Sequence, residues 1–265
     1  TAKSKETNTT EQISLSTADG KYAGYTKTIS YDHIPTITYF PKATANLLKV
    51  DIKTVGKKVG YIVGAGDKVP DALNALGYDV HFLEEADIND QNLKQYDAIV
   101  VGVRAYNIFE FLSSRNDVLK RYVENGGNMI VQYMKSMQVG LRKVQTGPYP
   151  FTVAATRVTE ENAKVNFLLP QHAAFNYPNK ITEKDFEGWI QERSTYQVDQ
   201  SDEHFERLIG MNDVGEKESN GSLAIAKYGK GNYVYVGLVL FRQLPAGVPG
   251  AYRLMANLIA LPKNK

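Results

Sequence analysis

The sequence predicts an α/β fold in which helices cover both faces of a parallel sheet. Four short apolar runs recur between residues 58 and 133, and helical or polar segments separate them. Strands that alternate with helical patterns indicate βαβ units, and parallel strands buried on both faces are apolar along their whole length. The crossovers between such strands are right-handed in nearly all proteins, which restricts the topology further.

The individual elements follow from changes in periodicity. The four strands are expected at residues 58–64, 79–84, 97–103 and 128–133. Helices are expected at residues 69–76, 115–125 and 251–261, and a β-hairpin at 222–240. Gly77 and Gly126 follow the first two helices, where a left-handed glycine commonly ends a helix. A glycine-rich turn joins the two alternating runs of the hairpin, which we expect to extend the sheet antiparallel.

The first fifty residues differ in composition from the rest of the chain. Residues 1–20 are rich in Thr, Ser, Lys and Glu. We expect a poorly packed polar tail there, because so few apolar groups cannot offset the entropy of ordering them. Two prolines interrupt the aromatic and β-branched stretch at 22–40, which favours an extended connector or an edge strand. The expected division is thus 1–50 as tail and connector, and 51–265 as the main domain.

Composition excludes several classes of protein. Hydrophobic residues make up 43% of the 265 residues and charged residues 23%, as in ordinary soluble globular proteins. The formal net charge is +2 with both signs mixed along the chain, so the basic stripe of a nucleic-acid-binding protein is missing. No apolar run reaches the roughly 18–20 residues that span a bilayer, and the polar start at Thr1 lacks a signal-peptide pattern. The absence of cysteine excludes disulfides and thiolate nucleophiles.

Metal and cofactor chemistry has little support, and we expect neither a metal nor a cofactor. The four histidines are scattered, without the His-x-x-x-His spacing of a helical zinc site. The turn at Gly64–Asp67 lacks the third glycine of a dinucleotide site and the Gly-Lys-Ser/Thr of a P-loop. A tight turn with Asp67 as helix N-cap is therefore favoured there over an anion site. The Gly-x-Ser-x-Gly elbow of a serine hydrolase is also missing.

A ligand site is expected where the parallel strands end, because open α/β sheets bind ligands beyond their carboxyl ends. Arg104 offers a rigid fork of donors, and Asn107 and Gln132 can both donate and accept hydrogen bonds. Tyr106 adds a flat surface on which a sugar can stack, and Trp189 and Arg193 are candidates for a far wall. The candidate ligand-binding residues are thus Arg104, Tyr106, Asn107, Gln132, Trp189 and Arg193. Alternatively, Glu84 or Glu85 binds Arg104 in an ion pair and no site exists.

A second group of polar residues falls in the irregular stretch after residue 136. Asp185, Glu187 and Glu192 lie near Trp189 in the sequence, with His172 upstream. Paired carboxylates beside an aromatic ring suit acid–base work on a sugar. Solvated surface charge explains the same pattern more simply.

The fourth strand carries a resemblance to a known family. The run from Gly126 to Tyr133 resembles the strand that leads to the nucleophile elbow of class I glutamine amidotransferase-like domains, including the ThuA-like branch. An active member has cysteine at the following turn, whereas here residues 132–136 read Gln-Tyr-Met-Lys-Ser. The resemblance implies a flavodoxin-like fold without amidotransferase chemistry.

Longer motifs carry a second resemblance, over roughly residues 25–261. These motifs are residues 31–35, 60–67, 96–107, 147–152, 185–193 and 244–253. They look like the C-terminal region of bacterial PIG-L/LmbE-type deacetylase proteins. The chain departs from that family at Met134, where the family has Asn, and at residues 194–197, where the family sequence is closer to Gly-Leu-Tyr-Phe. The resemblance implies a zinc deacetylase domain and a β-rich segment upstream, with 1–50 as the connector. It also implies a periplasmic or extracellular location.

The expected function is therefore that of a non-catalytic accessory domain of a deacetylase-type protein, binding carbohydrate or assisting assembly. Its expected partners are the upstream deacetylase domain and a carbohydrate ligand. One alternative is a carboxylate-dependent hydrolase acting on a carbohydrate derivative. Another is a purely structural oligomerisation module, which rests on analogy with assembly domains of some glycosidases.

Overall fold

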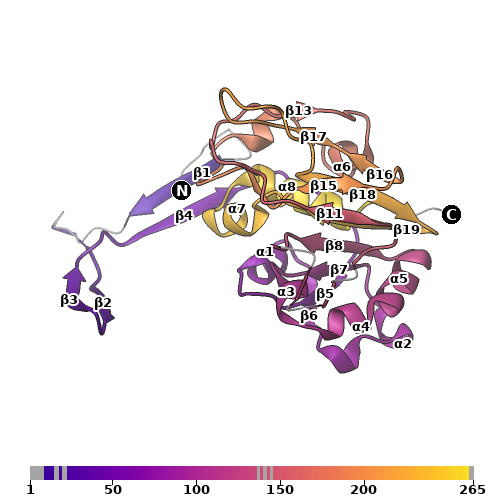
Figure 1. The fold of residues 1–265 in the computed structure, drawn as a ribbon. Coiled ribbons are helices and arrows are strands. Elements are labelled where there is room, and N and C mark those ends of the chain that lie inside the picture. Colours follow the sequence, from indigo (N-terminus) through magenta and orange to yellow (C-terminus); the bar gives the residue numbers. More distant parts are fainter. Residues whose placement is uncertain are drawn as a thin grey trace. The chain divides into compact units, whose positions relative to one another are not determined.

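The computed structural model describes residues 9–14, 18–19, 23–135, 138–139, 142–143 and 146–262. The chain divides into two compact units, Thr1–Asp51 and Ile52–Lys265 (Figure 1). Among the described residues, every helix is too short or too polar to cross a bilayer.

The first unit consists of two antiparallel strand pairs. Strand β1 (Thr9–Ser14) pairs with β4 (Thr44–Lys49), and β2 (Lys27–Tyr31) pairs with β3 (Ile34–Tyr39). The extended connector expected at 22–40 is thus a hairpin. Residues 9–14, within the expected polar tail, form a strand whose residues 12–14 are exposed, because ladder hydrogen bonds join backbones whatever the apolar content of the side chains.

The second unit is built on one seven-stranded sheet, ordered β16-β18-β19-β8-β7-β5-β6. Its strands are β5 (Lys58–Ile62), β6 (Asp79–Phe82), β7 (Ala98–Val101), β8 (Asn128–Gln132), β16 (Phe205–Arg207), β18 (Leu223–Tyr228) and β19 (Gly231–Val236). The four predicted strands β5 to β8 run parallel, which confirms the fold class. The predicted hairpin is β18–β19. Its inner strand β19 runs parallel to β8, so the antiparallel extension begins at β18.

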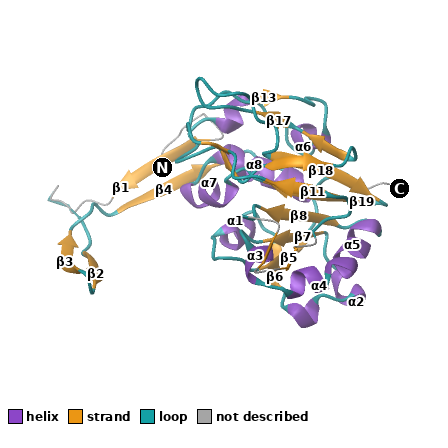
Figure 2. Ribbon diagram, viewed as in Figure 1, coloured by secondary structure: helices purple, strands orange, loops and turns teal. Residues whose placement is uncertain are grey.

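Helices cover both faces of this sheet (Figure 2). One face packs against α1 (Val69–Ala75), α6 (Ala173–Asn176), α7 (Leu240–Ala246) and α8 (Pro249–Ile259). The other packs against α2 (Asp90–Leu93), α3 (Ala105–Ile108), α4 (Phe111–Ser114) and α5 (Asn116–Glu124). Successive strand residues alternate between the two cores, as Tyr61 and Ile62 do.

The irregular stretch after residue 136 holds short elements. Its strand pairs are β9 (Gln138–Val139) with β10 (Arg142–Lys143), β11 (Phe151–Val153) with β15 (Val198–Ser201), β12 (Arg157–Val158) with β14 (Ser194–Thr195), and β13 (Asn166–Phe167) with β17 (Ile209–Gly210). Two 3-10 helices complete the chain, η1 (Glu85–Asp87) and η2 (Glu183–Phe186). Phe175, Phe186 and Trp189 from this stretch are buried against the sheet, so it belongs to the core.

Candidate site at the carboxyl edge of the sheet

The turn after β7 places Arg104 at the carboxyl edge of the sheet in a left-handed backbone conformation. Its φ is 60° and its ψ is 15°, directly before α3. The Arg104 amide donates to the carbonyl of Tyr133 at 2.8 Å, which ties the end of β7 to the turn after β8. The Arg104 carbonyl accepts from the amide of Asn107 at 2.8 Å. A sharp turn at the sheet edge is thus fixed from both sides.

The guanidinium of Arg104 makes no hydrogen bond with any described residue. Arg104 is half-buried, and its Nε is fully buried without a partner. The ion pair with Glu84 or Glu85 that the sequence left open does not form among the described residues. Glu85 contacts Arg115 at 3.5 Å instead, and Glu84 caps η1. The terminal amino groups of Arg104 remain as uncommitted donors at the sheet edge.

Tyr133 stands at the centre of this edge. Its ring stacks on Tyr196 with centroids 5.5 Å apart, and it lies 5.4 Å from the ring of Phe241. Burial raises the pKa of the Tyr133 phenol above its usual value, while the positive charges of Arg104 and Arg242 oppose that rise. Two guanidinium groups and three aromatic rings therefore converge where β7 and β8 end.

A buried carboxylate organises the arginines beside Phe241. The side chain of Glu192 is 3% exposed, and its Oε2 accepts from the Nε of Arg157 at 3.0 Å. Its Oε1 lies 3.2 Å from Arg242, whose guanidinium is 5.3 Å from the ring of Phe241. Arg157 and Arg242 thus share the carboxylate of Glu192.

Backbone strain gathers at the same place. Among the described residues, Arg104, Gln191 and Tyr196 are the non-glycine residues with positive φ. Two of them contact Tyr133, and the third precedes Glu192. A left-handed residue other than glycine costs roughly 1–2 kcal/mol and persists where surrounding contacts enforce it, often at functional sites. For Tyr196 one such contact is a hydrogen bond of 2.6 Å from the Tyr235 hydroxyl to its carbonyl.

Asn107 and Gln132 are also at this edge, and both take part in local bonds. The Oδ1 of Asn107 accepts from the amide of Lys135 at 2.7 Å. Gln132 is 3% exposed and donates from Nε2 to the Tyr61 hydroxyl at 3.2 Å, while its Oε1 has no partner. The structure thus brings Arg104, Asn107 and Gln132 to one end of the sheet.

The turn at Gly64–Asp67 is structural. Asp67 accepts from the Tyr61 hydroxyl at 2.6 Å and from the amide of Val69, at the start of α1, at 3.0 Å. A Cβ on Gly64 would lie 2.1 Å from the carbonyl oxygen of Val103, so β5 and the end of β7 approach too closely for any side chain there. The carboxylate of Asp67 is therefore used within the fold, although the formal N-cap residue is Lys68.

Besides Gln132, three more of the six candidate residues are buried, which differs from the exposed surfaces expected of them. Tyr106 is 1% exposed, Trp189 3% and Arg193 5%. The Trp189 indole donates to the carbonyl of Asp185 at 3.0 Å, and the Arg193 guanidinium lies 5.6 Å from its ring. Burial lowers the pKa of Arg193 to about 10. The far wall expected from Trp189 and Arg193 is instead a cation–π contact inside the core, and the Tyr106 ring has no face open to a ligand.

The candidate carboxylates do not form an acid–base pair. Asp185 accepts from Arg253 at 2.8 Å and from the amide of Thr182 at 2.8 Å. Glu187 is exposed, and the arginines described above bind Glu192. Within the described ranges, no three His, Asp or Glu side chains come together as a metal site.

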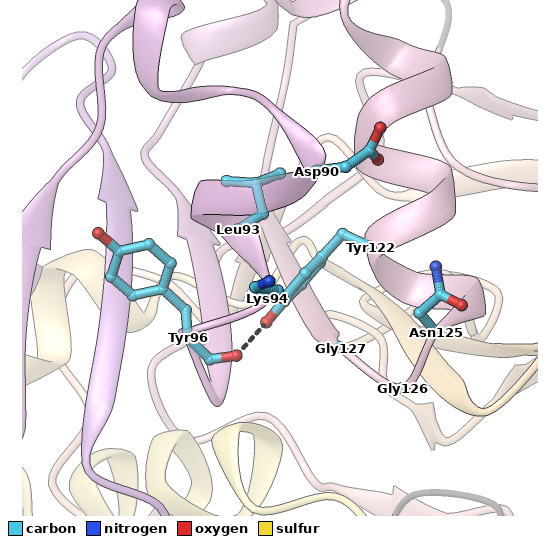
Figure 3. A pocket seen from close by; sticks show the side chains of 8 residues that line it. All are labelled: Asp90, Leu93, Lys94, Tyr96, Tyr122, Asn125, Gly126 and Gly127. Atoms are coloured by element: carbon cyan, nitrogen blue, oxygen red, sulfur yellow. Dashed lines mark hydrogen bonds between the residues drawn. The ribbon is translucent and has the colours of Figure 1, made fainter.

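Two pockets lie at the opposite, amino edge of the sheet. The first, of about 130 Å³, is lined by Asp90, Leu93, Lys94, Tyr96, Tyr122, Asn125, Gly126 and Gly127 (Figure 3). The Tyr122 hydroxyl reaches across to the Tyr96 carbonyl at 3.1 Å. The second, of about 460 Å³, is lined by Val55, Gly56, Asp97, Asn128, Tyr177, Ile259, Ala260, Leu261 and Pro262.

The charged groups of the amino-edge pockets are already paired. Asp90 accepts from the Arg121 guanidinium at 3.0 and 2.9 Å, and Asp97 accepts from the amides of Lys57 and Lys58. Sequence reasoning missed both pockets because it considered only the carboxyl ends of the strands. The unpaired cation at Arg104 makes the carboxyl edge the stronger candidate site.

Comparison with known proteins shows a likeness in structure alone. The chain matches no protein-family model and no curated protein. A ThuA-like protein from Bacteroides uniformis superposes with a TM-score of 0.52 at 12% identity, over 78% of this chain and 91% of that one. A protein described as a GMP synthase subunit, from Thermoplasma acidophilum, gives 0.45 at 13% identity over 78% and 94%. A β-galactosidase from Rahnella sp. R3 gives 0.46 at 17% identity over 76% of this chain.

The likeness to the ThuA-like protein extends over nearly all of that chain, whereas this chain spans only 31% of the β-galactosidase. The shared feature is the sheet described above, with parallel strands β5 to β8 and helices on both faces. The chain therefore has a flavodoxin-like α/β fold, similar to that of the ThuA-like protein.

Proposed function

We propose that this chain is a non-catalytic accessory domain that binds a polar, carbohydrate-derived ligand at the carboxyl edge of its sheet, around Tyr133. The observation that carries the proposal is the position of Arg104. Its guanidinium has no partner among the described residues, and a strained backbone holds it beside the Tyr133 ring. The buried Nε of Arg104 lacks a hydrogen-bond partner, which is costly unless a ligand supplies one.

Two features support a role without catalysis. The chain has no cysteine, and Tyr133 occupies the turn where an amidotransferase-like enzyme has its nucleophile. The buried carboxylates that could act as acid and base are already bound to arginines. Binding by Arg104, Asn107 and Gln132 needs neither group.

The motifs shared with PIG-L/LmbE-type proteins support a larger context. In this proposal the domain belongs to an exported protein whose deacetylase domain lies upstream, and ligand binding here brings that domain to a carbohydrate. The test is the full-length protein carrying Arg104→Ala. We expect slower deacetylation of polymeric substrate and unchanged deacetylation of a small soluble one.

Calorimetry tests the binding step directly. Neutral sugars and sugar acids are titrated into the wild type, Arg104→Ala and Arg121→Ala. Arg121 is the matched control because its guanidinium already binds Asp90 at the amino edge. We expect Arg104→Ala to weaken binding about tenfold or more, since charge-assisted hydrogen bonds are the strong ones. Ligand binding that is equal in all three proteins would place the site elsewhere.

Assembly is a second candidate function, favoured by the first unit. Tyr31 is 62% exposed, Phe40 66% and Ile13 53%, on or directly after strands of pairs that are marginally stable in water when alone. Such surfaces commonly bind another protein. Light scattering of the wild type and of a Tyr31→Ser, Phe40→Ser variant tests this. An equal mass for the two proteins would count against assembly through these residues.

A further inference from the structure

We infer that the ligand of this carboxyl-edge site is a sugar acid, with a carboxylate that Arg104 binds and a hydroxylated ring that lies against Tyr133 and Phe241. The inference rests on the proposed function and specifies its ligand. Three properties of the site lead to it: one uncommitted guanidinium, an aromatic surface, and an unpaired buried acceptor.

The guanidinium requires an anion. The guanidinium of Arg104 has no hydrogen bond to any described residue, and the Nε of Arg242, whose charge also acts on the Tyr133 phenol, is buried without a partner. Because a guanidinium carries only donors, its partner must be an acceptor, and a charged acceptor gives the stronger bond.

The number of free guanidinium groups favours a single carboxylate over a phosphate. Arg157 and Arg242 already share the carboxylate of Glu192. Of these three arginines, only Arg104 therefore has a guanidinium without a carboxylate partner among the described residues. The paired N–H groups of one guanidinium match the two oxygens of one carboxylate.

The surroundings of Arg104 favour a sugar ring over a simple acid. Tyr133, Tyr196 and Phe241 are half-buried; Tyr133 stacks on Tyr196, and its ring is tilted against that of Phe241, so the three rings form an aromatic cluster near the cation. Aromatic side chains combine a flat apolar face with a polar tip, which suits the two kinds of surface on a sugar. Gln132, at the same end of the sheet, has a buried Oε1 without a hydrogen-bond partner, and such an acceptor suits a sugar hydroxyl.

The experiment compares four probes by calorimetry in low-salt buffer: D-glucuronate, its neutral methyl ester, D-glucose 6-phosphate and D-glucose. The proteins are the wild type, Arg104→Gln and the control Arg121→Gln. We expect glucuronate to bind wild type and control about tenfold or more tighter than each of the other probes. In Arg104→Gln glucuronate and its ester should bind equally. Raised salt should weaken the binding of glucuronate but not that of its ester or of glucose, because screening acts on the charge.

Each other outcome separates this inference from the proposed function. If the wild type binds glucuronate and its ester equally, the inference that the ligand is a sugar acid is wrong. If that binding still requires Arg104, the proposed site at the carboxyl edge stands. If the wild type binds D-glucose 6-phosphate more tightly than glucuronate, the inference that the ligand carries a carboxylate is wrong, and the proposed site again stands if binding requires Arg104. Binding of no probe, or binding that ignores Arg104, overturns both. The comparison of acid with ester uses the wild type, so it stands even if a variant fails to fold.

Discussion

The ring of Tyr133 stacks on the ring of Tyr196 with their planes within 7° of parallel and their centroids 5.5 Å apart. Tyr133 follows the central strand β8, and Tyr196 lies on the irregular stretch that returns to the sheet edge. Tyr196 has a left-handed backbone conformation. Arg104, in the turn after β7, has one too. The pair thus joins two strained turns, and the cation at Arg104 is held beside it.

The strain at Arg104 predicts a trade between stability and binding. Glycine adopts a left-handed backbone freely, whereas alanine keeps the penalty of a side chain. We expect Arg104→Gly to be more stable than Arg104→Ala by about 0.5–1 kcal/mol, after allowing for the greater entropy of unfolded glycine. Urea unfolding measures the difference. Both variants should lose the ligand, and a glycine variant less stable than the alanine variant would contradict a strained Arg104.

Replacing Glu192 should destabilise the folded chain at the same edge. Glu192→Gln removes the carboxylate that two arginines share, but those arginines are 51% and 36% exposed, so water can solvate them. We expect a loss of about 1–3 kcal/mol in the free energy of unfolding, as for a charged hydrogen bond. Glu187→Gln, at an exposed glutamate of the same stretch, is the matched control and should change the free energy of unfolding by less than about 0.5 kcal/mol. Equal effects of the two changes would show that Glu192 does not organise this edge.

His172 predicts a dependence of stability on pH. Its Nδ1 accepts from the amide of Ala174 at 3.1 Å, and burial is the main cause that lowers its pKa from 6.5. A lowered histidine pKa means that the unfolded chain binds a proton first as the pH falls. Stability from this group is therefore complete above pH 6.5 and is lost as the pH falls toward the folded-state pKa.

Urea unfolding at several pH values below neutrality, on the wild type and on His172→Asn, measures this contribution. Asparagine can still cap α6 but does not titrate in this range. The wild type should lose more stability than the variant as the pH falls. Parallel pH profiles of the two proteins would rule out His172 as the cause.

Asn257 predicts a large loss from one buried amide. Its Nδ2 donates to the carbonyls of Ala174 and Asn179, and its Oδ1 accepts from the amide of Asn179 at 3.0 Å. Asn257→Ala leaves these groups buried without partners, which costs on the order of 3 kcal/mol. Asn74→Ala, at an exposed position of α1, is the control. Thermal unfolding of the pair should show a clear drop only for Asn257→Ala, and a small effect there would show that water replaces the amide.

The sheet could be predicted from sequence because its signals are local. The apolar runs of β5, β7 and β8 are contiguous, and Gly77 ends α1 with a φ of +87°. The pairing of β1 with β4 could not be predicted, because Thr9 meets Lys49 through backbone bonds that composition does not encode. The topology rule that follows from the sheet also placed Arg104, Asn107 and Gln132 at one edge.

The rest of the site depends on contacts between residues far apart in the chain. Tyr133 contacts Tyr196 and Phe241, and no local pattern marks either partner. Trp189 and Arg193 were wrongly expected to form an exposed wall of the site. An aromatic residue and a cation close in sequence suit an open cleft and a core contact equally well. Their burial follows from packing against Phe186, which only the folded chain reveals.

The central claim is that a ligand binds at the carboxyl edge around Tyr133, and chemical-shift mapping tests it most directly. Isotope-labelled protein is titrated with D-glucuronate while its backbone amides are followed by nuclear magnetic resonance. The predicted result is that the amides of Arg104, Tyr133 and Tyr196 shift together, while those of Gly126 and Gly127 at the amino-edge pocket stay unchanged. Shifts confined to Gly126 and Gly127, or no shifts with any of the four probes, would contradict the claim.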